Sequence, residues 1–152
     1  MDSFEDVAEL LDYPMFVVTT ASNGRRAGCL VGFATQISID PARFLVGLSV
    51  NNHTHQVAAD ASRLVVHLLD ADSMDVARLF GEKTGDEVDK FAQCAWSPGP
   101  DGVPVLDEPP AWFSGTPGQT YWFWVTVRTN LGWTDANSSP SITLPGTLPK
   151  QQ

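Results

Sequence analysis

The chain has 152 residues, the length of one domain, and its 43% hydrophobic content is enough for a single core. The formal charge is −9, and Arg25-Arg26 is the only adjacent pair among nine basic residues, which argues against nucleic acid or an anionic membrane as a partner. The start is acidic, and no apolar run reaches about 20 residues, so we expect a cytoplasmic protein without a signal peptide or membrane span.

The first predicted elements are a short helix and a hairpin. A capping-box pattern and apolar residues at helical spacing predict a helix over residues 3–11, which Pro14 ends. Residues 15–20 are β-branched and aromatic and predict a strand. Asn23-Gly24 is a strong hairpin signal, so we expect the return strand over residues 27–33.

The middle of the chain mixes strands with one helix. We expect a short strand over residues 37–39, and a strand over residues 44–50 whose unbroken apolar run suggests burial on both faces. Residues 51–54 are interpreted as a polar loop and residues 55–61 as a short helix. The apolar run 64–69 predicts a further strand.

The last third is less regular. Asp72 or Ser73 is expected to cap a helix that carries Met74 to Phe80. Residues 81–89 are interpreted as a polar loop or a mobile helix end, and a proline-rich stretch follows. Aromatic runs predict strands that start at Ala111 and over residues 121–127.

These elements do not alternate strand and helix, which argues against a doubly wound parallel sheet. The sequence instead predicts a mainly β fold, an antiparallel split β-barrel with a few short helices. We expect one domain over residues 1–133. Residues 134–152 are dominated by Pro, Ser, Thr and Gly and are interpreted as a loosely ordered tail.

Few residues suggest familiar catalytic chemistry. No G-x-x-x-x-G-K-[ST], G-x-G-x-x-G or G-x-S-x-G motif occurs. His53 and His55 have no Cys or third His nearby, so no metal site is predicted, and His67 lies in an apolar run typical of a packed residue. Cys29 and Cys94 form no C-x-x-C motif, and we expect two reduced thiols.

Small polar residues cluster instead after two predicted strands, around residues 35–38 and 49–54. Hydroxyls, amides and backbone N–H groups can hold a phosphate without a net positive charge. Ordinary loop residues have the same composition, and spacing alone leaves both interpretations open.

The order of these motifs resembles flavin reductase-like proteins. Residues 13–20 resemble the family's opening strand, and residues 32–41 look like its flavin loop, in which a small polar stretch precedes Ser, two residues and Pro. Residues 44–54 are similar to the next strand and its Ser/Thr-bearing turn. Later parts of the pattern match at residues 64–69, 77–80, Asp89-Lys90-Phe91 and Trp112-Phe113.

The resemblance implies an FMN-binding homodimer, with flavin near the subunit interface, that uses NADH or NADPH to reduce FMN or FAD and can supply a partner monooxygenase. Hydride transfer is the cofactor's own chemistry, so no catalytic acid or base is expected. The cofactor-binding residues that the resemblance implies are Gly32, Phe33, Ala34, Thr35, Gln36, Ser38, Ser49, Asn51, His53, Thr54 and Lys90.

One part of the family pattern is missing. A Gly-Asp-His motif is expected soon after Trp112-Phe113, but residues 116–152 contain no His. One hypothesis is a one-nucleotide frame change, because a Trp-Val-Thr triplet such as Trp124-Val125-Thr126 can encode Gly then Asp out of register. An intact frame in an independent isolate would contradict it. The gap leaves two alternatives open: a non-catalytic flavin-binding module, and a split-barrel oxidoreductase using another cofactor.

Overall fold

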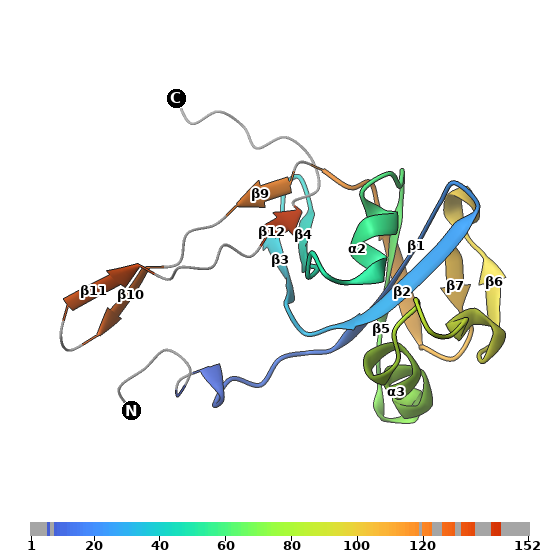
Figure 1. Ribbon diagram of the computed structural model, residues 1–152, viewed down its shortest axis with the longest axis horizontal. Coiled ribbons are helices and arrows are strands. Elements are labelled where there is room, and N and C mark those ends of the chain that lie inside the picture. Colours follow the sequence, from blue (N-terminus) through green and yellow to red (C-terminus); the bar gives the residue numbers. More distant parts are fainter. Residues whose placement is uncertain are drawn as a thin grey trace.

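Two four-stranded antiparallel sheets carry the fold, which is mainly β as expected (Figure 1). The computed structural model describes residues 6, 8–118, 120–122, 126–129, 132–135 and 141–143, with side chains described up to residue 118. The first sheet has the order β2-β1-β5-β8, and the second has the order β3-β4-β12-β9. In these residues no helix is long and apolar enough to cross a bilayer.

The strands of the first sheet are β1 (Phe16–Ser22), β2 (Arg25–Val31), β5 (Leu64–Leu68) and β8 (Ala111–Gly115). Those of the second are β3 (Ala34–Ser38), β4 (Arg43–Gly47), β9 (Thr120–Trp122) and β12 (Ser141–Thr143). Separate hairpins are β6 (Trp96–Pro98) with β7 (Pro104–Leu106), and β10 (Thr126–Thr129) with β11 (Gly132–Asp135). The helices are α2 (His53–Ala58) and α3 (Met74–Glu82), with 3-10 turns η1 (Ala71–Ser73), η2 (Lys90–Ala92) and η3 (Pro100–Gly102).

The β1–β2 hairpin follows directly from its turn residues. Asn23 has φ 51° and Gly24 has φ 73°, so both take the left-handed conformation that a two-residue type I′ turn requires. The register runs from Ser22 opposite Arg25 to Phe16 opposite Val31. The hairpin prediction is therefore confirmed, although β2 starts and ends two residues earlier than expected.

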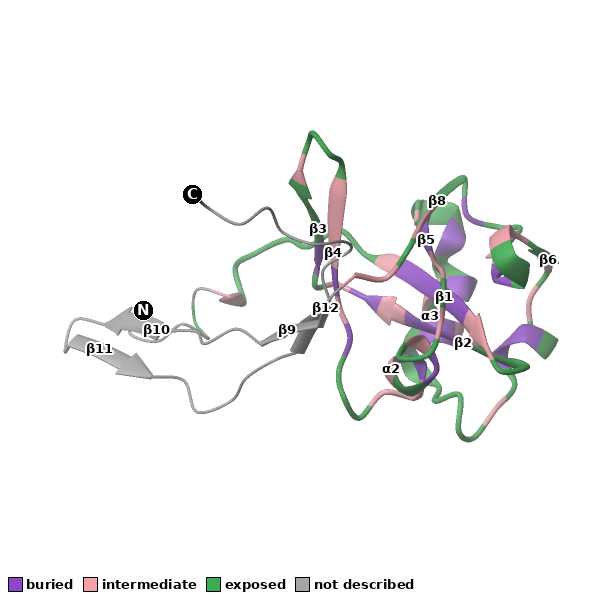
Figure 2. Cartoon of the chain, turned by 90° about the horizontal axis from the view of Figure 1, so that it is seen from above, coloured by how far each residue is buried: buried purple, intermediate pink, exposed green. Residues whose placement is uncertain are grey.

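The first sheet separates two hydrophobic clusters, because successive side chains of a strand point to opposite faces. Val18 belongs to a cluster shared with β4, whereas its neighbour Val17 belongs to one formed with α3 and η2. Both side chains are 0% exposed, and burying each is worth about 1.5–3 kcal/mol. Figure 2 shows the buried residues concentrated around β1.

The sequence predicts that the strand over residues 44–50 is buried on both faces, but in the structure other strands are buried in this way. β4 ends at Gly47, and in this chain Arg43, Phe44 and Leu45 are only half-buried. β1 and β5 lie in the middle of their sheet and are the doubly covered strands, which an apolar run alone does not distinguish.

Other boundaries also differ from expectation. β3 is a full strand over Ala34–Ser38, where a loop and a short strand were expected, and α2 begins at His53 inside the expected polar loop. The proline-rich stretch contains β6 and β7, which proline content concealed. Ser73 precedes α3 without a side-chain cap, and Asp70 caps the preceding turn instead.

The chain ends are described in part. Of the helix expected over residues 3–11, Asp6 and Ala8 are helical and residues 9–10 form a turn, while residues 3–5 and 7 lie outside the described residues. Within the expected tail, β12 pairs with β4 and β9, with Ile142 opposite Gly47 and Tyr121. The boundary at residue 133 and the loose order of the rest of the tail stay predictions, as does the frame-change hypothesis.

Candidate functional site

A polar cavity of about 440 Å³ lies between the end of β4, the start of α2 and the segment after α3. Three of the residues expected to bind cofactor, Ser49, Asn51 and His53, line it from the β4–α2 connection, and Lys90 lines it from η2. The rest of the lining comprises Cys29, Leu30, Asn52, Phe80, Gly81, Glu82, Lys83, Thr84, Gly85 and Glu87. Hydroxyl, amide and cationic donors therefore meet around one hollow.

The first turn of α2 forms one wall of this cavity. Asn52 is the N-cap, and its side-chain oxygen accepts from the Thr54 backbone N–H at 2.8 Å. Thr54 is only 1% exposed and contacts the Cys29 thiol, so it supports the wall from beneath and is absent from the lining.

Cys29 forms part of the cavity floor as a thiol. Burial raises the pKa of Cys29, and the hydrogen bond with Thr54 opposes that shift only in part. Both Cys29 and Cys94 are free, as expected from the sequence.

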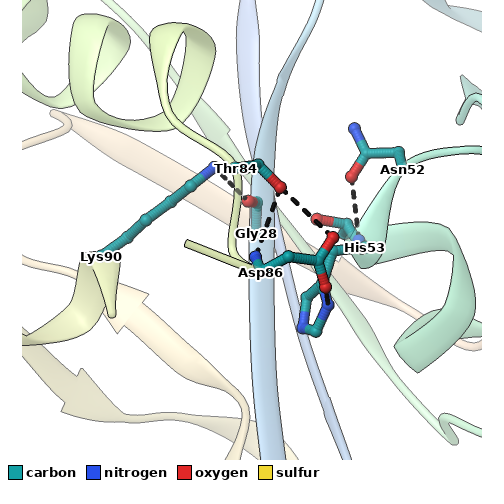
Figure 3. A network of polar contacts seen from close by, with 7 residues as sticks. Gly28, Asn52, His53, Thr84, Asp86 and Lys90 are labelled. Carbon is teal, nitrogen blue, oxygen red and sulfur yellow. Dashed lines mark hydrogen bonds and ion pairs between the residues drawn. The ribbon is translucent and has the colours of Figure 1, made fainter. Parts of the chain in front are cut away.

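Lys90 is 5% exposed, and its ammonium faces inward. Nζ donates to the Gly28 carbonyl oxygen at 3.1 Å (Figure 3). It also donates to the Phe80 carbonyl oxygen at 3.2 Å, and so joins β2 to the end of α3. Burial lowers the pKa of Lys90. Its first role in the structure is thus to satisfy carbonyl groups at the cavity wall.

His53 joins the opposite wall to the loop after α3. Its Nδ1 lies 2.8 Å from Asp86 Oδ1, and the Thr84 hydroxyl donates to Asp86 Oδ2 at 3.4 Å (Figure 3). Gly85 fits against the imidazole, because a Cβ there would stand 2.9 Å from His53 Cδ2. The sequence indicated a polar loop or a mobile helix end over residues 81–89, and nothing in it marked this segment as a site wall; the structure places Gly81 in α3 and Gly85 in the loop.

The remaining expected residues lie on or before β3. Ala34 pairs with Val46, which puts Gly32, Phe33 and Ala34 at the end of β4 that leads to Ser49. Thr35 and Gln36 follow along the exposed strand. Ser38 pairs with Arg43 at the far end, about 13 Å from Ala34 at 3.3 Å per residue.

Gln36 does not line the polar cavity. It lines a separate, mainly apolar cavity of about 430 Å³ together with Phe44 and Phe113, whose ring centroids are 5.0 Å apart. The structure therefore brings together Ser49, Asn51, His53 and Lys90, and leaves the residues of β3 as a strip leading away from them.

Comparison with known proteins decides the family. The flavin reductase like domain matches residues 9–130. The chain belongs to this family. Over 123 residues it is 29% identical to the reductase component of flavin-dependent trigonelline monooxygenase from Acinetobacter baylyi, covering 76% of this chain and 39% of that relative.

Two further proteins are similar to this chain. The NADH:riboflavin 5′-phosphate oxidoreductase of Streptomyces pristinaespiralis is 31% identical over 107 residues, 70% of this chain and 60% of that protein. The solved structure of a Streptomyces globisporus NADH:FAD oxidoreductase, in complex with NAD and FAD fragments, has a TM-score of 0.73 at 19% identity, with 95% of this chain and 81% of that chain covered. The chain therefore spans 39% of the length of the trigonelline monooxygenase reductase component and 60% of the length of the NADH:riboflavin 5′-phosphate oxidoreductase.

Proposed function

We propose that this flavin reductase-family chain binds FMN or FAD and reduces the flavin with NADH or NADPH. The observation that carries the proposal is that β4, the partner strand of exposed β3, leads directly to residues of the polar cavity. Ala34 pairs with Val46 near the end of β4, and Ser49 and Asn51 follow that end in the chain, so a ligand with its phosphate in the cavity can extend along β3 towards Ser38.

The residues present fit the two halves of such a ligand. The cavity offers the Ser49 hydroxyl and the Asn51 amide, which suit phosphate oxygens. β3 is the edge of the described sheet, and its outward N–H and C=O groups suit the polar edge of a flavin ring. A bound flavin supplies the hydride chemistry, while the chain binds the phosphate, orients the ring and excludes water from one face.

The proposed assembly is a cytoplasmic homodimer that hands reduced flavin to a monooxygenase. Large apolar side chains are exposed beside β3, with Phe33 at 72% and Ile39 at 87%, and a second copy would cover them. The similarity to the reductase component of trigonelline monooxygenase supports a monooxygenase as the acceptor of the reduced flavin.

A non-catalytic flavin-binding module is the second candidate. It is favoured by residues 116–152, which hold no His and therefore no Gly-Asp-His motif.

The absorbance spectrum of the purified protein, with mass spectrometry of the released ligand, tests both candidates. Flavin bands with NADH or NADPH oxidation upon FMN addition support the reductase, and flavin bands without turnover support the module. A protein that neither carries nor takes up flavin contradicts both candidates.

A further inference from the structure

A second hollow adjoins the polar cavity on the side of the β1–β2 turn. It measures about 290 Å³ and shares His53, Gly85 and Lys90 with the first. Its other lining residues are Gly24, Arg25, Arg26, Gly28, Val88, Asp89 and Phe91. Its volume is at the lower end of ligand pockets, so it suits one fragment of a ligand rather than a complete dinucleotide.

Two arginines, Arg25 and Arg26, line this hollow. Arg25 and Arg26 are exposed, and within residues 8–118 neither forms an ion pair. A pair of unpaired guanidinium groups beside a hollow is the arrangement that an anionic group would neutralise.

Arg26 is also held in position. Its guanidinium carbon lies 4.8 Å from the Trp96 ring centroid and 5.9 Å from that of Phe91. Stacking on two aromatic faces restricts the side chain before any ligand arrives, which reduces the entropy cost of binding.

Two acidic groups near this hollow, Asp89 and Asp86, accept hydrogen bonds from donors of the protein. Asp89 lines the hollow, and its carboxylate accepts from the Phe91 backbone N–H at 3.0 Å. Asp86 is held by His53 and Thr84. Neither acid pairs with Arg25 or Arg26.

We propose that this second hollow binds the adenosine phosphate half of a dinucleotide, with Arg25 and Arg26 on its phosphate. The inference rests on the proposed function, since the other half of the ligand would occupy the adjoining polar cavity. Adenosine phosphate is common to FAD and to NADH or NADPH, and a bare FMN would leave the hollow empty. The arginine pair thus favours the dinucleotide over the mononucleotide.

Titration of the full chain with AMP tests the hollow by itself. The variants are Arg25→Ala and Arg26→Ala, with Arg26→Lys to keep the charge without the planar fork. Arg78→Ala is the matched control, because Arg78 is exposed on α3 and lines neither hollow. We expect each alanine variant to weaken AMP binding by about tenfold, Arg26→Lys by less, and Arg78→Ala not at all.

Two further titrations identify the source of the adenosine phosphate. If the source is FAD, the arginine variants lose affinity for FAD but keep that for FMN. If it is the nicotinamide dinucleotide, they raise its KM and leave FAD and FMN binding equal to wild type. Absence of saturable AMP binding, or equal loss in Arg78→Ala, overturns the proposal. Failure of the wild type to bind FMN would instead count against the proposed function.

Discussion

His53 Nδ1 lies 2.8 Å from Asp86 Oδ1 and ties the first turn of α2 to the loop after α3. The imidazole is largely covered and Asp86 is 60% exposed. This contact fixes the wall that the two adjoining hollows share.

Asp86→Ala should therefore reduce the order and ligand affinity of the site more than it reduces the global stability of the protein. An exposed side-chain contact of this kind contributes at most about 1 kcal/mol, so we expect a small loss of unfolding free energy. Amide hydrogen exchange over residues 83–89 should accelerate, and FMN affinity should fall about threefold as the wall loses order. Asp12→Ala, at an exposed acid away from the site, serves as control. Unchanged exchange in the loop would contradict the role of the pair.

The direction in which flavin extends can be tested at the two ends of the proposed path. Ser49→Ala and Ser38→Ala should each weaken FMN binding by about 1–2 kcal/mol, because each substitution leaves an acceptor atom of the ligand without its hydrogen-bond donor. A titration followed by flavin fluorescence measures both. A loss confined to Ser49→Ala would show that the ligand does not follow β3 to its end.

How far the sequence predicted the fold depends on how local each signal was. Asn23-Gly24 fixed a hairpin through its own backbone conformations, and this prediction was confirmed. The sequence could not place β6 and β7, because their pairing depends on Leu106 meeting Trp96 across a loop that contains prolines. Long-range pairing of this kind leaves little trace in local composition.

The same limit applied to the site. The sequence pattern identified the polar residues after β4, and the structure places three of them, Ser49, Asn51 and His53, on the wall of the polar cavity. It could not reveal Asp86 as the partner of His53, 33 residues away, nor that Lys90 turns its charge inward to two carbonyl oxygens.

Lys90 should matter first for stability. Lys90→Met keeps the length and apolar stem of the side chain but leaves the Gly28 and Phe80 carbonyl oxygens without a donor. We expect a loss of about 2 kcal/mol in urea unfolding. Lys83→Met is the control, since Lys83 is exposed and its Nζ donates to the side chain of Gln93 at 3.3 Å, and its loss should stay below about 0.5 kcal/mol. Equal losses would argue against the inward role.

His67 predicts a dependence of stability on pH. It is fully buried, its Nδ1 lies 3.0 Å from the Val17 carbonyl oxygen, and Nε2 accepts from the Leu106 backbone N–H at 2.9 Å, which fixes the neutral imidazole. Burial lowers the pKa of His67 from 6.5. The unfolded chain therefore binds the proton first, and stability is lost as pH falls below about 6.5 towards the lower folded value.

His67→Gln keeps a donor and an acceptor but removes the titration. Carboxylates also titrate at acid pH, so the informative quantity is the difference between wild type and variant in urea unfolding at about pH 7 and about pH 5. We expect the wild type to lose more stability over this interval than His67→Gln. Parallel curves would show that the imidazole does not titrate as proposed.

The last prediction concerns salt. A chain of charge −9 repels a phosphate dianion at long range, so FMN affinity must come from short hydrogen bonds in the polar cavity. Screening by salt weakens this repulsion together with any attraction from Arg25 and Arg26, so FMN affinity should change little, or rise slightly, from low to moderate ionic strength. Thr54 supports the wall near Asn52, whereas Arg25 lies at the second hollow that FMN does not fill. Thr54→Ala should therefore cost more FMN affinity than Arg25→Ala. An affinity that collapses with salt, or a larger loss in Arg25→Ala, would mean that the FMN phosphate lies at the arginine pair instead.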